Sequence, residues 1–129
     1  MSTPFKLNHP GTCVMRVIAF LLACLATEAA RAHAFVIASH PAANGTVPPG
    51  ALAVDLQFNS RIDRARARLV LVMGDADRRE LTIKDDERPD HVTADTAPLA
   101  AGTYRIEWYA LSPDGHVTRG FVPFAVVQP

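Results

Sequence analysis

The chain has 129 residues, of which 49% are hydrophobic and 20% are charged, with 13 basic and 13 acidic side chains. This length and composition suit one globular domain and leave no room for two. The balanced charge gives no reason to expect nucleic acid or an anionic membrane surface as a partner.

The first 32 residues have the pattern of a secretory signal peptide. Lys6 and Arg16 precede an apolar run of ten residues at 17–26, and the small-residue stretch that follows ends in Ala-Arg-Ala at 30–32. This order of basic region, apolar region and A-x-A site is typical of export, and a membrane span would need about 20 apolar residues. We therefore predict cleavage after residue 32 and a periplasmic domain at 33–129.

An alternative start of the mature protein lies within the same segment. The sequence LLAC, which ends at Cys24, resembles a lipoprotein cleavage box and would make Cys24 a lipidated first residue. Cleavage after Ala32 instead removes both cysteines, Cys13 and Cys24. The mature domain would then be held together by its core alone, without a disulfide.

Beyond residue 32 the apolar residues recur with a period of two, in short segments separated by turn residues. Strands are predicted, in chain order, at 34–39, 52–58, 67–73, 80–83, 91–95, 102–111 and 118–127. The charged stretch KDDERPD at 84–90 is interpreted as a solvated loop. About seven short strands in a domain of this size indicate an all-β Greek-key sandwich or small barrel.

Some strands also carry predictions about burial. Alternation places every second residue of two strands on one face, namely Leu52, Val54, Leu56 and Phe58, and Tyr104, Ile106, Trp108 and Ala110. The strand at 67–73 is nearly all apolar, as expected for a strand covered on both faces, so Met73 is expected in the core. The sequence LAAGTY at 99–104 resembles the tyrosine corner of immunoglobulin-like sandwiches.

The loop between the last two predicted strands, SPDGHVTRG at 112–120, carries two possible metal ligands. Asp114 and His116 are two residues apart, so in an extended segment their side chains leave the same edge and reach one point. Pro113 and Gly115 favour a fixed turn there. By itself this D-x-H pattern is weak evidence for a metal, because loop aspartates often cap turns.

Cleavage after Ala32 would give His33 a second donor. As the first residue it offers an amine and an imidazole, and Asp114 and His116 add an oxygen and a further nitrogen. Three nitrogens and one oxygen in a roughly square arrangement suit Cu(II), although zinc also accepts His, His and Asp.

The remaining histidines and methionine of the predicted mature domain are not assigned to the metal. His40 precedes Pro41 at a turn, and His91 follows the acidic loop, so both are interpreted as surface residues. Met73 is the only methionine beyond residue 32, which argues against a methionine-rich Cu(I) site.

The motifs together resemble a known family. HAF directly after the cleavage site, then SHPAANG, LQFNS, LAAGTYRIEW and LSPDGHVTRGFVPFAV, are similar to the CopC family of small periplasmic copper-binding proteins. The resemblance implies a seven-stranded Greek-key β-barrel of cupredoxin and immunoglobulin-like type. It also implies that Cu(II) is bound by His33, Asp114 and His116. The protein would be a monomer, and a separate CopD-type inner-membrane copper protein would be its partner.

Two positions depart from the family pattern. Relatives often carry a glutamate near the copper ligands where this chain has Ser60, which puts a supporting carboxylate in doubt. Relatives also often have proline after the loop histidine, where this chain has Val117.

We therefore expect a Cu(II) carrier or buffer without enzymatic activity. One alternative is a metal-free immunoglobulin-like interaction module, in which His33 is merely the first residue. A histidine-brace copper oxygenase is a second alternative, which Asp114 disfavours because it would fill a position that oxygen needs.

Overall fold

The computed structural model describes Pro4 and residues 33–129. Apart from Pro4, the predicted signal peptide at 1–32, its cleavage site and the alternative at Cys24 lie outside the described residues. Within those residues, no helix is long and apolar enough to cross a bilayer.

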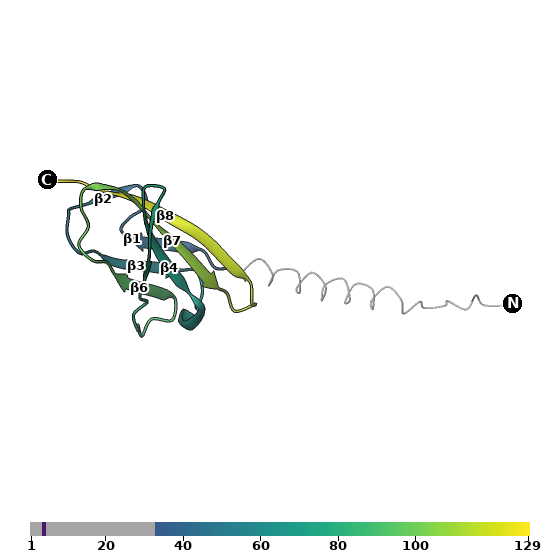
Figure 1. The fold of residues 1–129 in the computed structure, drawn as a ribbon. Coiled ribbons are helices and arrows are strands. Elements are labelled where there is room, and N and C mark those ends of the chain that lie inside the picture. The colour runs from purple at the N-terminus through teal and green to yellow at the C-terminus, as the bar shows by residue number, and fades with distance from the viewer. Residues whose placement is uncertain (1–3, 5–32) are drawn as a thin grey trace. The chain divides into compact units, whose positions relative to one another are not determined.

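Residues 33–129 form eight strands and one short 3-10 helix (Figure 1). In chain order these are β1 (Val36–His40), β2 (Gly45–Val47), β3 (Ala53–Phe58), η2 (Arg64–Arg66), β4 (Arg68–Met73), β5 (Asp77–Leu81), β6 (His91–Asp95), β7 (Gly102–Leu111) and β8 (Val117–Val126).

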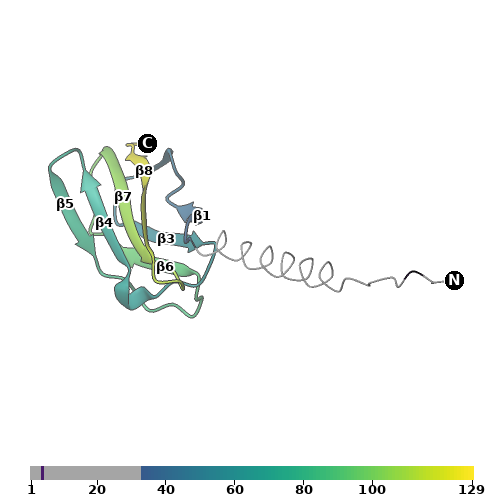
Figure 2. The same ribbon diagram turned by 90° about the vertical axis from the view of Figure 1, so that its right-hand side faces the viewer.

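The strands make two sheets, one with the order β1-β3-β6 and the other with the order β2-β8-β7-β4-β5. Neighbouring strands are antiparallel except β2 and β8, which are parallel. Figure 2 shows β5, β4, β7 and β8 side by side in the larger sheet. The prediction of an all-β sandwich is confirmed, and the two sheets do not close into a barrel.

The predicted strands match seven of these elements, with two differences. β2 was not predicted, because a strand of three residues is too short to show alternation. β5 begins at Asp77, before the predicted 80–83, because its first residues are polar and give no apolar signal.

The core lies between the sheets and contains both predicted faces. The four alternating residues of 52–58 and the four of 102–111 are all buried. Phe58 of β3 meets Trp108 of β7 edge-on, with ring centroids 5.2 Å apart. The two sheets therefore pack through residues whose burial was predicted from the period of two.

β4 is covered on both faces, as predicted, but Met73 is not in the core. Val70 and Val72 are buried, and so are the core residues Leu69 and Leu71. Met73, by contrast, is 41% exposed, so this prediction was wrong. Met73 is the last residue of β4, and the turn at Gly74 carries the chain away before another strand covers it.

The predicted tyrosine corner is present. The Tyr104 hydroxyl donates to the carbonyl oxygen of Ala100 at 2.7 Å, and the Tyr104 ring stacks on Phe124 with centroids 5.5 Å apart. The start of β7 is thereby tied to the loop that precedes it, and the far end of the same strand enters the loop of the predicted metal ligands.

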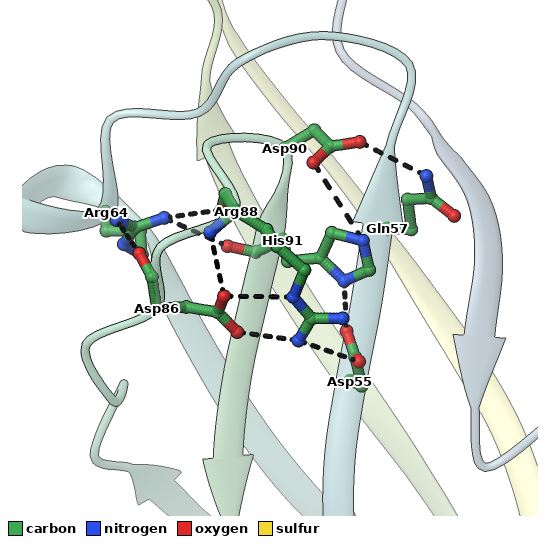
Figure 3. Close-up of polar contacts among 7 residues, drawn as sticks. All are labelled: Asp55, Gln57, Arg64, Asp86, Arg88, Asp90 and His91. Carbon is green, nitrogen blue, oxygen red and sulfur yellow. Dashed lines mark hydrogen bonds and ion pairs between the residues drawn. The ribbon is translucent and has the colours of Figure 1, made fainter.

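The charged stretch at 84–90 is mostly exposed, as predicted, but it is firmly held (Figure 3). The Arg64 guanidinium donates to the backbone carbonyl oxygens of Asp86 and Arg88. The Arg88 side chain forms ion pairs with Asp86 and, across to β3, with Asp55. These contacts attach the loop to η2 and to the smaller sheet.

Candidate metal centre

The two predicted loop ligands lie in the tight connection between β7 and β8. The Gly115 N–H donates to the Ser112 carbonyl oxygen at 2.9 Å, and the Ser112 N–H donates to the His116 carbonyl oxygen at 3.0 Å. Gly115 has a φ of 86°, in the left-handed region that favours glycine. This turn brings the side chains of Asp114 and His116 into contact.

The Asp114 carboxylate organises this loop. Its Oδ2 lies 2.8 Å from His116 Nδ1, and its Oδ1 accepts the His116 backbone N–H at 3.1 Å. Because an ionised carboxylate only accepts, His116 Nδ1 carries the proton that the two side chains share. Hydrogen bonds from the Ser112 hydroxyl, and then from the His116 ring and backbone, hold the pKa of Asp114 well below its usual range. Asp114 is therefore ionised at neutral pH.

Ser112 is a supporting residue that is not predicted from the sequence. It is 3% exposed, and its hydroxyl lies 2.6 Å from Asp114 Oδ1 and 2.8 Å from the His116 carbonyl oxygen. A hydroxyl has one proton, so it donates to one of these oxygens at a time. The available signal was a small polar residue between the last residue of β7, Leu111, and Pro113.

His33 lies beside this loop, three residues before β1 begins. The centroids of the His33 and His116 rings are 5.7 Å apart, and the rings are tilted by 54°. The structure thus brings together the two predicted histidines, and Asp114 contacts the second of them.

The separation of the two imidazole rings matches that of two ligands of one metal ion. Metal bonds to nitrogen and oxygen are about 2.0 Å long, so neighbouring ligand atoms lie roughly 2.8 to 3.3 Å apart and two imidazole centroids roughly 4 to 6 Å apart. The 5.7 Å between the ring centroids falls within the second range, whereas the 2.8 Å between His116 Nδ1 and Asp114 Oδ2 is the length of the hydrogen bond that joins them.

The described residues do not form a finished coordination shell. Among Pro4 and residues 33–129, no group of three or more His, Cys, Asp or Glu side chains stands ready to hold a metal ion. In the uncleaved chain the backbone nitrogen of His33 is an amide bonded to Ala32. The amine that is predicted as a donor would arise only on cleavage.

The two positions that depart from the family pattern differ in their surroundings. The Ser60 hydroxyl is buried and has no hydrogen-bond partner in the described part of the chain, and the same is true of Thr118, two residues after His116. Val117 is 67% exposed. Ser60 therefore contributes a neutral hydroxyl, unpaired among the described residues, and no negative charge at this position.

Of the two histidines interpreted as surface residues, only His40 is exposed. The His91 side chain is 13% exposed, so that interpretation was wrong. Its Nδ1 lies 2.6 Å from Asp55 Oδ1, and Gln57 donates to the neighbouring Asp90 (Figure 3). His91 is covered because β6 pairs with β3, a contact that its own flanking sequence does not reveal.

A family model described as the CopC domain matches residues 36–127 of the chain. The copper transport protein CutJ of Bacillus subtilis is 26% identical over 114 residues, which cover 85% of this chain and 21% of CutJ. The chain thus spans about a fifth of that relative's length. Copper resistance protein C of Xanthomonas campestris pv. juglandis is 28% identical over 122 residues, which cover 88% of this chain and 94% of the relative.

The fold is also similar to a solved structure. The crystal structure of CopC from Methylosinus trichosporium OB3b superposes with a TM-score of 0.66 and 25% sequence identity, over 74% of this chain and 95% of that one. The similarity therefore extends across most of the sandwich.

Proposed function

Because the chain belongs to the CopC family, we propose that its mature form is a periplasmic Cu(II)-binding protein that acts as a copper carrier or buffer in copper homeostasis or resistance. A copper-related function is supported by the names of the relatives, a copper transport protein and a copper resistance protein. The location rests on the signal-peptide pattern of residues 1–32.

The proposed ligands are His33, through its amine and imidazole, Asp114 and His116. The observation that carries this proposal is the approach of the His33 and His116 rings to 5.7 Å, with the ionised Asp114 at 2.8 Å from the second ring. Copper would displace the proton shared by Asp114 and His116. The metal would then bind a carboxylate and an imidazole that the loop already holds close together.

The chemistry of the proposed ligands and the exposure of His116 suit a metal ion that is passed on to another protein. Nitrogen donors favour Cu(II) over the other divalent first-row ions, with zinc as the natural competitor. The His116 side chain is 69% exposed, so an acceptor protein can reach the metal without unfolding the loop. We propose a CopD-type inner-membrane copper protein as that acceptor or donor, with this chain acting as a monomer.

Titration of the exported, processed protein with Cu(II) tests this function. Visible absorbance and electron paramagnetic resonance are expected to show one type-2 copper with nitrogen couplings and no oxidase activity. Absence of binding would favour a metal-free interaction module, and oxidation of added reductants by oxygen would favour a copper oxygenase. Mass spectrometry of the same sample shows whether His33 is the first residue.

A further inference from the structure

Three hydrogen bonds join Asn59, the first residue after β3, to the segment that precedes β1. The side-chain Oδ1 accepts the Phe35 backbone N–H at 2.8 Å, and the side-chain Nδ2 donates to the His33 carbonyl oxygen at 3.1 Å. The Asn59 backbone N–H donates to the Phe35 carbonyl oxygen at 3.0 Å. We call these three bonds the Asn59 clamp.

The clamp lies where the regular sheet does not reach. The pairing of β1 with β3 starts with Val36 opposite Phe58 and shifts register before Ala38. Residues 33–35 come before the first paired residue of β1. Because the ends of a domain fray unless other contacts hold them, this segment needs an anchor. A further anchor in this segment is Ala34, whose side chain is 2% exposed and packs in the core.

The chemistry of the clamp requires an amide. One partner, the Phe35 N–H, only donates, and the other, the His33 carbonyl oxygen, only accepts. An asparagine side chain satisfies both at once, whereas an alanine satisfies neither and leaves only the backbone bond of residue 59. The side chain of Asn59 therefore holds the backbone on both sides of Ala34.

We infer that Asn59 is a positioning residue for copper binding. Asn59 holds the His33 backbone so that the His33 ring and, after cleavage, the His33 amine face His116. This inference rests on the proposed function, because its effect on copper presupposes His33 as a ligand. Asn59 itself does not touch the metal. It acts by ordering the terminal residue before copper arrives.

The expected effect follows from the entropy of ordering a chain end. Fixing the backbone of one residue lowers an equilibrium constant by about tenfold. In Asn59→Ala, copper itself must order His33, so we expect Cu(II) binding to weaken by roughly tenfold. The loop at 112–116 makes none of the clamp bonds and is expected to keep its structure.

The experiment compares the exported, processed wild type with Asn59→Ala in two measurements. Hydrogen exchange of the metal-free proteins follows the amide of Phe35, which donates to the clamp, and the amide of Gly115, which reports the loop. Competition titration with a chelator of known affinity gives the Cu(II) dissociation constant. We expect Asn59→Ala to accelerate exchange at Phe35 but not at Gly115, and to raise the dissociation constant roughly tenfold.

Thr96→Val is the matched control. The Thr96 hydroxyl accepts the Leu52 N–H at 3.0 Å, so it forms a comparable side-chain bond to the backbone at the opposite end of β3. This variant is expected to accelerate exchange at Leu52 and to leave copper affinity unchanged. An equal loss of affinity in Thr96→Val would mean that lowered stability explains the effect and would overturn the inference.

The inference and the proposed function fail in different ways. Unchanged exchange at Phe35 in Asn59→Ala overturns the clamp whether or not the wild type binds copper. Accelerated exchange at Phe35 with wild-type copper affinity overturns the positioning role. A wild type that does not bind Cu(II) at all overturns the proposed function, while the exchange measurement still decides whether the clamp exists.

Discussion

The imidazole rings of His33 and His116 lie 5.7 Å apart, although one precedes the first strand of the sandwich and the other precedes the last. The smaller sheet positions the first ring through β1 and the clamp, and the larger sheet positions the second through the β7–β8 loop. A metal bound by both rings would therefore link the two sheets of the sandwich.

Substitution of the loop ligands is expected to weaken Cu(II) binding without unfolding the protein. His116→Ala removes a nitrogen donor, so we expect a loss of affinity of about 100-fold or more, whereas Asp114→Asn keeps an oxygen and loses less. Competition titration measures both, and circular dichroism checks the fold. The control is His40→Ala, an exposed histidine outside the site. Wild-type affinity in either loop variant would exclude the loop as the site.

Extension of the mature protein by one residue tests the amine of His33. A cytoplasmic form that starts with Met before His33 converts the amine into an amide, whose proton is much harder to displace by a metal. We expect weaker copper binding and an altered spectrum, although both rings and Asp114 are unchanged. The control is the same protein after removal of the methionine. Equal affinity in the two forms, with the extra residue verified by mass spectrometry, would show that the amine is not a ligand.

Acidification is expected to release copper before it disturbs the loop. Protons compete for the imidazole and amine nitrogens, so binding should decline below neutral pH and be largely lost toward about pH 5. A visible copper band that persists unchanged at pH 4 would contradict nitrogen donors. The measurement is a titration of that band against pH.

The loop itself is expected to persist to lower pH in the metal-free protein. The pKa of Asp114 is lowered in the folded state, chiefly by the Ser112 hydroxyl, from an ordinary value of 3.8. A lowered pKa contributes stability that is present above pH 3.8 and is lost as pH falls through the folded value. Ser112→Ala should raise the pKa of Asp114 toward 3.8, as NMR of the carboxylate would show. An unchanged pKa in this variant would contradict the assigned cause.

Gly120→Ala is expected to destabilise the sandwich at the seam between β7 and β8. A Cβ atom at this position would lie 2.5 Å from the nearest carbon of the Trp108 ring, which is packed against Phe58 in the core. Overpacking of this kind costs about 1 to 3 kcal/mol. Urea unfolding monitored by the fluorescence of Trp108 measures the loss, and unchanged stability would show that the ring can move aside. The control is Gly74→Ala, where a Cβ meets no neighbouring atom and a positive φ is the only source of strain.

The sequence by itself determined the local features of this protein. Strand periods, the buried faces of β3 and β7, the tyrosine corner and the nearness of Asp114 to His116 all follow from residues a few positions apart, whose geometry the backbone dictates. The family and its sandwich were also recognisable from motifs. The ligand role of His33, Asp114 and His116 remains a prediction.

Only the tertiary structure decided which distant residues meet. The approach of His33 to His116, the hold of Asn59 on the N-terminal segment and the cover over His91 depend on the pairing of β1 and β6 with β3 and on the packing of one sheet against the other. Met73 shows the same limit, because an apolar residue at a strand end is buried only when another element covers it. Such contacts arise from the sum of many weak packing interactions across the whole chain, and no short stretch of sequence contains them.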